Sequence, residues 1–284
     1  MRCPAGCLSG YRTGSMNKKH VFIYRNATEK SIEIEKDLRN KLIKSGLRVY
    51  EEFDPEETEL ILCIGGDGTL LRLMQDLDFP ETPVVGINTG HLGFFQEVLP
   101  DRIDEMIYQY NQGNYTLQSF STVTGIITTG EGQFIHTGLN EIAVKGAPTY
   151  PVHLNISIND SFIERFSGDG ICVSTPAGST AYNYSLGGSI VDPRLNVLQV
   201  APIAPMNSTA YRSFTSSILI PESDTLIIEP CMEYDDDELI VVYDGIMNEY
   251  VGVTEIQIML SEKKVNMVRF KDQHFWDKCK NKFL

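Results

Sequence analysis

Short apolar runs alternate with helical spacing over the first part of the chain. The run HVFIY at 20–24 predicts a buried strand. Ile34, Leu38 and Leu42 then recur at i, i+4 and i+8, the spacing of one helix face, and a glycine at 46 can end this helix. Further elements of the same kind are the strands LRVY, ELILCI and PVVGI and the helices from Thr69 to Asp76 and from Asp101 to Gln112. This alternation predicts a parallel sheet covered by helices on both faces.

A different period follows after Gln118. In VHLNISIND at 152–160, apolar and polar residues alternate, which predicts a half-buried strand that ends at an Asn-Asp turn. Similar patterns occur in STVTGIITTGEGQFIH, DTLIIEP, ELIVVYDG and EIQIML, so this part of the chain predicts an antiparallel β domain. The last segment, FKDQHFWDKCKNKFL at 270–284, mixes aromatic and basic residues and predicts a helix that packs back on the first domain.

The predicted fold class is therefore α/β followed by β. An N-terminal α/β (Rossmann-like) domain with a parallel sheet spans 16–118 and is completed by 265–284, and a C-terminal antiparallel β domain spans 119–264. Residues 1–15 are expected to be an expression tag, because Gly14-Ser15-Met16 resembles a cloning scar ahead of a natural start at Met16.

Composition and charge limit the classes of function. With 284 residues, 42% of them hydrophobic, the chain can bury a sizeable core. A formal net charge of -14 argues against a nucleic-acid surface, but backbone N–H groups and magnesium can still hold an anionic small ligand. The sequence contains no run of about 18 apolar residues, which is the length that a helix needs to span a membrane. The cysteines after the expected tag are widely spaced and lack a CxxC motif, which predicts reduced thiols in a cytoplasmic protein.

The stretch GGDGT at 65–69 joins a predicted strand to a predicted helix. Its glycines let backbone N–H groups approach a ligand, and a helix that begins at Thr69 attracts anions, so the turn predicts a phosphate cradle. It lacks the GK[ST] of a P-loop and the spacing of a dinucleotide fingerprint. Asp67 would repel a phosphate unless it accepts a proton or holds magnesium, and either role suits phosphoryl transfer. The alternative is a tight turn with Asp67 as the helix cap.

Two further stretches have the composition of ligand-binding loops. GINTGHLGFF combines three glycines with Asn88, Thr89 and His91, although an ordinary glycine turn would look the same. GLNEIAV places Asn140 and Glu141 inside an apolar strand, where unpaired polar side chains cost free energy. These two residues therefore need either a structural partner or a ligand.

The longest candidate stretch is SGDGICVSTPAGSTAYNYSLGG at 167–188. Its Gly, Ser and Thr residues offer many hydrogen-bond donors, and Tyr182 could stack on a flat ring. Ser174 and Ser179 lie outside any GxSxG elbow, which argues against a serine hydrolase. The five histidines show no metal-ligand spacing.

With these stretches together, the chain resembles the NAD kinase family, most closely its Gram-positive bacterial branch. The matching segments are GGDGT at 65–69, GINTGHLGF at 86–94, NE at 140–141 and GDGICVSTPAGSTAYN at 168–183. GGDGT has counterparts in diacylglycerol kinases and phosphofructokinases, whereas STPAGSTAYN makes the resemblance specific. The family transfers the terminal phosphoryl group of ATP, with Mg²⁺, to the 2'-hydroxyl of the adenosine ribose of NAD. Some bacterial members also use inorganic polyphosphate, and members are homo-oligomers, commonly tetramers.

The resemblance assigns roles position by position. The α/β domain would bind the phosphate donor and the β domain much of NAD. Asp67 would be the catalytic carboxylate that meets the 2'-hydroxyl. The residues on phosphate would be Gly66, Gly68 and Thr69. The residues on NAD would be Asp67, Gly68, Phe94, Asn140, Glu141, Asp169, Thr180, Ala181, Tyr182, Ser185 and Asp244.

Two positions depart from the family pattern. Ser167 stands where Gram-positive relatives usually have Arg, which removes a possible cation near the product's 2'-phosphate, and Ala177 stands where Ser or Thr is common.

Two other functions are alternatives to NAD kinase activity. A diacylglycerol-kinase-like lipid kinase would favour a basic or amphipathic membrane-facing patch. The acidity of the chain argues against such a patch. A non-catalytic dinucleotide sensor would not need a carboxylate at Asp67.

Overall fold

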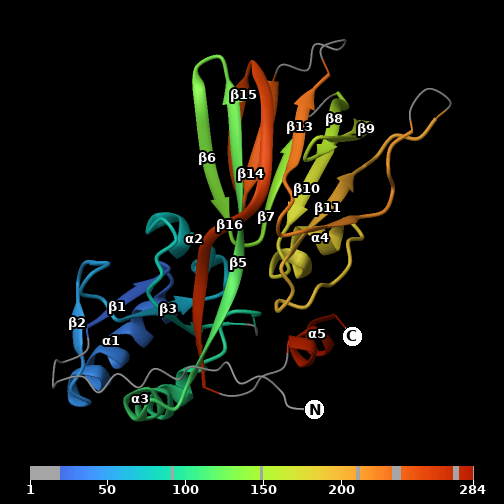
Figure 1. Cartoon of the computed structure of the whole chain (residues 1–284). Coiled ribbons are helices and arrows are strands. Elements are labelled where there is room, and N and C mark those ends of the chain that lie inside the picture. The colour runs from blue at the N-terminus through green and yellow to red at the C-terminus, as the bar shows by residue number, and fades with distance from the viewer. Residues whose placement is uncertain are drawn as a thin grey trace, which may run out of the picture.

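The first part of the chain forms the parallel half of a ten-stranded sheet, sheet A (Figure 1). In this computed structural model the described residues are 20–90, 93–147, 150–208, 212–231, 238–270 and 275–283. Parallel strands lie in the order β2-β1-β3-β4. Their bounds are β1 (His20–Arg25), β2 (Arg48–Tyr50), β3 (Leu60–Gly65) and β4 (Val84–Asn88).

Helices cover both faces of this parallel half, as the sequence predicts. They are α1 (Glu29–Lys44), α2 (Asp67–Asp76), α3 (Ile103–Gln112), which follows the short turn η1 (Pro100–Arg102), and α5 (Phe275–Phe283). The predicted face of α1, Ile34, Leu38 and Leu42, is buried in one cluster with α3 and the strands. Residues of α2 and α5 share the cluster on the opposite face. The hydroxyl of Thr28 caps α1 by accepting from the Ser31 N–H, and Gly46, at φ +88°, follows its end.

Sheet A continues without a break into the second part of the chain. The 17-residue strand β16 (Val253–Arg269) pairs in parallel with β4 near one end and with β5 (Thr116–Thr129) and β13 (Leu226–Pro230) in antiparallel fashion. The predicted boundaries at 118 and 265 thus fall inside strands that both parts share, and the division into domains stays a prediction. The remaining strands of sheet A are β6 (Gly132–Gly138), β8 (Val152–Ile158) and β9 (Ser161–Gly168).

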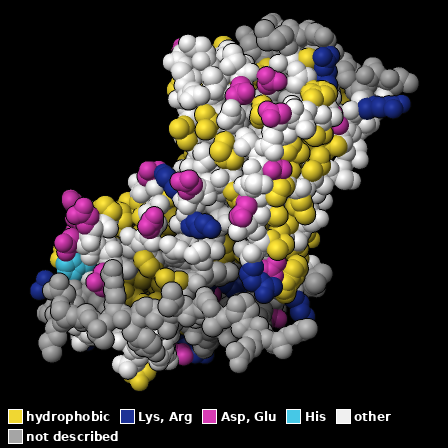
Figure 2. Space-filling model, viewed as in Figure 1, with side chains coloured by type: hydrophobic (Ala, Val, Ile, Leu, Met, Phe, Trp, Pro, Cys, Tyr) yellow, Lys and Arg dark blue, Asp and Glu magenta, His cyan; other side chains and the backbone are white. Residues whose placement is uncertain are grey.

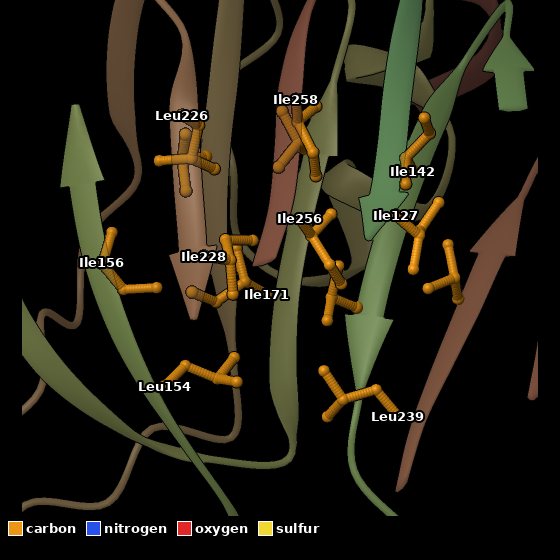
Figure 3. Packing of buried hydrophobic residues seen from close by; sticks show 14 of the residues in the cluster. Ile127, Ile142, Leu154, Ile156, Ile171, Leu226, Ile228, Leu239, Ile256 and Ile258 are labelled. Atoms are coloured by element: carbon orange, nitrogen blue, oxygen red, sulfur yellow. The ribbon is translucent and has the colours of Figure 1, made fainter. Parts of the chain in front are cut away.

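Sheet B is entirely antiparallel, which confirms the fold class predicted for the second part. Its strand order is β12-β11-β10-β7-β14-β15. The bounds are β7 (Glu141–Lys145), β10 (Gly170–Ser174), β11 (Val197–Ile203), β12 (Ile218–Pro221), β14 (Glu238–Tyr243) and β15 (Ile246–Val251). Apolar side chains of the two sheets form one core, to which Ile171 of sheet B and Ile228 and Ile256 of sheet A belong (Figure 3).

The C-terminal segment forms the expected helix, α5, and returns to the first part. The ring of Phe94 lies 5.9 Å from those of Phe275 and Phe283. Trp276 donates from Nε1 to Asp192 Oδ2 at 3.1 Å, so α5 also contacts the β-rich part.

The surface carries charges of both signs. On the face in Figure 2, Lys and Arg side chains are scattered among Asp and Glu, and apolar side chains gather over the β-rich part. None of the described helices is long and apolar enough to cross a membrane.

Candidate active site

The glycine turn lies at the carboxyl end of β3, where it leads into α2. The helix begins at Asp67, two residues before the predicted Thr69, and Gly66 is its N-cap. A Cβ at Gly65 would come within 2.1 Å of the Thr69 hydroxyl oxygen, so only glycine lets β3 pass this close to α2. At Gly66 and Gly68 an added Cβ would meet nothing within 4 Å. Open space therefore borders the helix N-terminus, where free N–H groups attract anions.

Asp67 does not cap the helix. Its Oδ2 accepts from the Phe94 N–H at 2.9 Å, and its Oδ1 accepts from the Phe95 N–H at 3.1 Å. A Cβ at Gly93 would lie 2.2 Å from Oδ1, so the carboxylate rests directly on this loop. Each carboxylate oxygen has two acceptor sites, and one on each oxygen is left for a ligand. The capping alternative is therefore wrong.

Asn140 and Glu141 lie at the start of β7, on a turn that Asp244 holds. The Asp244 carboxylate accepts from the N–H groups of Leu139, Asn140 and Glu141 at 2.6, 2.8 and 3.3 Å. Unlike these backbone groups, two side-chain atoms, Asn140 Oδ1 and Glu141 Oε2, are buried without a hydrogen-bond partner. Buried polar atoms of this kind are normally satisfied, so this arrangement favours a ligand over a structural pair.

The loop before α4 (Tyr182–Ser185) wraps around Asn140. Thr175 donates its N–H to the Asn140 carbonyl at 2.9 Å, and a Cβ at Gly178 would come within 1.9 Å of the same oxygen. Burial raises the pKa of the Glu141 carboxyl, and the nearby backbone of Tyr182 opposes part of this rise. The half-buried Tyr182 ring lies 5.7 Å from Lys145 Nζ.

The two halves of the site are adjacent. Phe94, Leu139 and Ala177 are buried in one apolar cluster, which joins the loop over Asp67 to the turn at Asn140. In addition, Gln75 of α2 donates to the Thr137 carbonyl at 2.8 Å and to Asp244 at 3.5 Å. Phe94 is thus a buried packing residue between the two halves of the site.

The other predicted residues differ in their exposure and, for Asp169, in the distance from Glu141. Asp169 is exposed and lies just before β10, whereas Glu141 pairs with Ser174 at the other end of that strand. At about 3.3 Å per residue along a strand, Asp169 and Glu141 are about 16 Å apart. Ser185 is exposed at the end of α4, while Thr180 and Ala181 are half-buried before it. His91 lies outside the described residues.

Ser167 faces the interior. It is 1% exposed, and its hydroxyl pairs with His153 Nδ1 at 2.8 Å across β8 and β9. Its backbone also exchanges hydrogen bonds with the Ser213 hydroxyl. The expectation that this position faces a product phosphate therefore does not fit the structure, because the side chain is enclosed.

Several site residues were not predicted from the sequence. Gln96 donates to the Gly66 carbonyl at 3.1 Å, and Asn26 donates to the Thr69 hydroxyl at 3.2 Å. Lys282 Nζ lies 4.0 Å from Asp67 Oδ2. Gln96, a buried polar residue in the apolar run GFFQEV, is the one that its sequence context could have revealed.

Glu141 gives the site a pH-dependent contribution to stability. Burial raises the pKa of its carboxyl to about 8, and the nearby Asp244 adds to the rise. Between the ordinary pKa and about 8 the folded protein holds a proton that the unfolded chain releases, so stability falls as pH rises through this window. We expect Glu141→Gln to raise Tm by at least roughly 2 °C at pH 9 and much less at pH 5, measured by calorimetry. The exposed Glu249→Gln is the control, and an equal gain at both pH values would contradict the assignment.

The chain matches known proteins over nearly its whole length. Residues 13–115 match the family model of the ATP-NAD kinase N-terminal domain, and residues 139–270 that of the ATP-NAD kinase C-terminal domain. The NAD kinase of Finegoldia magna is 39% identical over 271 residues, which cover 94% of this chain and 99% of that protein. The NAD kinase of Staphylococcus saprophyticus is 30% identical over 251 residues, covering 87% and 92%.

Two solved structures have the same fold. Yeast NADH kinase complexed with NADH has a TM-score of 0.81 at 20% identity and covers 94% of this chain and 87% of that one. An NAD kinase from Archaeoglobus fulgidus in complex with ATP has a TM-score of 0.72 at 24% identity, covering 92% and 97%.

Proposed function

We infer the reaction from the family: this chain belongs to the NAD kinase family, and it is a kinase that phosphorylates NAD. Neither a lipid kinase nor a non-catalytic sensor fits this membership. We propose that the terminal phosphoryl group of ATP, or of polyphosphate as a second donor, is transferred to the 2'-hydroxyl of the adenosine ribose of NAD. The observation that carries this proposal is the Asp67 carboxylate, fixed by two backbone N–H groups beside open space at a helix N-terminus.

In the proposed mechanism Asp67 is the general base. Its carboxylate accepts the proton of the 2'-hydroxyl while the hydroxyl oxygen attacks the terminal phosphorus of the donor. The bond between that phosphorus and its bridging oxygen breaks, and the bridging oxygen leaves with ADP. Because the two N–H groups occupy only part of the carboxylate, Asp67 can orient the hydroxyl without leaving the Gly93–Phe95 loop.

The donor phosphates would lie against the N-terminus of α2. Gly66 and Gly68 border this space, Thr69 lies in the same first turn of α2, and Lys282, with its side chain 44% exposed, supplies a cation beside Asp67. Among the described residues there is no group of three or more His, Cys, Asp or Glu side chains that could hold a metal ion. This arrangement fits a magnesium ion that enters on the donor phosphates, because Mg²⁺ needs only one or two carboxylates besides phosphate and water. When bound, the ion would neutralise charge on the transferred group.

The acceptor would lie on the β-rich side. Asn140 Oδ1 and Glu141 Oε2, the two atoms without partners, would accept hydrogen bonds from the nucleoside, with Tyr182 stacked on a ring. Asp244 would act mainly through the turn it holds. Further residues proposed to contact NAD are Phe94, Asp169, Thr180, Ala181 and Ser185.

We further propose a homotetramer in the cytoplasm. Phe162 on β9, Ile135 on β6 and Val251 on β15 are exposed at 63%, 65% and 67%, and burial of such side chains against further copies would stabilise an assembly. The four described cysteines are free and buried, which suits a reducing compartment. Sedimentation of the purified protein tests the tetramer, and a monomer at micromolar concentration would contradict it.

The acceptor position can be tested directly. Purified protein with NAD, ATP and Mg²⁺ should form NADP, detected with an NADP-specific dehydrogenase. The analogue of NAD that carries 2'-deoxyadenosine should bind but give no product, because it lacks the hydroxyl that meets Asp67. Phosphorylation of this analogue would place the transferred group elsewhere, and failure to form NADP with either ATP or polyphosphate would overturn the proposal.

A further inference from the structure

A buried cluster of charges lies behind the loop that holds Asp67. It consists of Glu97, Arg269 at the end of β16 and Lys278 on α5, whose side chains are 6%, 8% and 9% exposed. Glu97 Oε2 lies 3.0 Å from Arg269 and 3.3 Å from Lys278. Removing three charges from water costs free energy that pairing and hydrogen bonds must offset. A cluster of this kind therefore suggests a function beyond stability.

Both cations donate to the loop that Asp67 contacts. Lys278 Nζ donates to the Phe94 carbonyl at 2.9 Å, and an Arg269 guanidinium nitrogen donates to the Phe95 carbonyl at 2.9 Å. The Phe94 carbonyl and the Phe95 N–H belong to one peptide unit. A single peptide therefore links the Lys278 ammonium on one side to Asp67 Oδ1 on the other. Hydrogen bonds in such a chain polarise and strengthen each other, most of all in a site of low dielectric.

Without Asp67 the buried cluster of Glu97, Arg269 and Lys278 carries one net positive charge, whereas Lys282, the other cation beside Asp67, is 44% exposed. Two cations face one carboxylate in Glu97, and Asp67 supplies the second negative charge. Burial lowers the pKa of both Arg269 and Lys278, and the carboxylates of Glu97 and Asp67 oppose this change. Asp67 is thus near enough to act as the second counter-ion of the buried pair.

We propose that Lys278, supported by Arg269 and Glu97, is a positioning residue that fixes the catalytic carboxylate through the Phe94–Phe95 peptide. The C-terminal helix thereby takes part in the reaction without touching the substrate. This inference rests on the role proposed for Asp67 as the base. It implies that loss of the Lys278 charge lowers the turnover rate more than it affects the binding of NAD.

The test compares substitutions on α5. Lys278→Met removes the charge and the donor but keeps the stem, and we expect kcat to fall about tenfold or more, with the KM for NAD within about threefold. Lys278→Arg retains a cationic donor and should restore most of the rate. Cys279→Ala is the matched control, because Cys279 is buried in the same helix but makes no part of this hydrogen-bond chain. It should lower Tm without a comparable loss of kcat.

A double-mutant cycle separates positioning from general damage. In an Asp67→Asn background, Lys278→Met should change kcat by less than about twofold, because the group it positions is gone. An equal loss in both backgrounds, or an equal loss from Cys279→Ala at a similar Tm, would overturn the inference. So would a folded Lys278→Met protein with wild-type kcat. If Lys278→Met does not fold, the same cycle is run with Lys278→Gln, which keeps a donor but no charge. Failure of the wild-type protein to form NADP would instead contradict the proposed function.

Discussion

Replacing Asp67 by Asn is expected to lower kcat by at least about a hundredfold while the affinity for NAD changes little. General-base catalysis contributes about 10² to 10⁴ in rate, and the amide has no basic lone pair to take the proton. The structure adds a second cost. The N–H groups of Phe94 and Phe95 each donate to one oxygen of Asp67, and Asn offers only one oxygen, so its NH₂ group would face a donor. Steady-state kinetics and an NAD titration of the same protein measure both quantities.

The matched control for this variant is Asp101→Asn, at an exposed position before α3, where kinetics should not change. Turnover near the wild-type rate in Asp67→Asn would remove Asp67 from the mechanism. Loss of NAD binding with the rate per bound complex intact would instead mean that Asp67 serves only to shape the loop.

The parts of the fold that the sequence predicts are those where burial follows one simple period. The strands β3 and β4 are buried at every position, and α1 buries one face. The strand β16 was predicted only over Glu255–Leu260, because its register with β5 shifts between Leu260 and Lys264 and polar residues interrupt the alternation there. The run STVTGIITTGEGQFIH is a hairpin, whose turn at Gly130 and Glu131 separates β5 from β6. The sequence pattern does not predict the strand β9, because its first residues are exposed on both faces.

In the candidate site, too, the sequence predicts only those residues that differ clearly from their neighbours. Asp67, Asn140 and Glu141 could be found because each stands out chemically from its glycine-rich or apolar surroundings. The groups that hold Asp67 are backbone N–H groups, which leave no signal of residue type, and Lys278 lies 184 residues from the carbonyl it binds. Ser167 stands out only by comparison with relatives, and its burial beside His153 depends on the pairing of β8 and β9. Contacts of this kind depend on the tertiary fold, so sequence patterns do not reveal them.

Gly93→Ala is expected to lower kcat by about a hundredfold with little loss of stability. The new Cβ would lie 2.2 Å from Asp67 Oδ1 and 2.7 Å from its Cγ, so the carboxylate must move away from the loop. The atoms in the way are the end of one side chain, so the carboxylate can move aside without unfolding of the backbone. A displacement of about 1 Å from the productive geometry can cost about 10² in rate.

The measurement that checks this prediction pairs kcat with Tm. The control is Gly130→Ala in the β5–β6 turn, where an added Cβ meets nothing within 4 Å, and both quantities should match the wild-type protein. Combined with Asp67→Asn, Gly93→Ala should add little further loss of kcat, because both changes act on the same carboxylate. Fully additive losses, or wild-type turnover in Gly93→Ala, would show that the position of Asp67 on this loop is not the one used in catalysis.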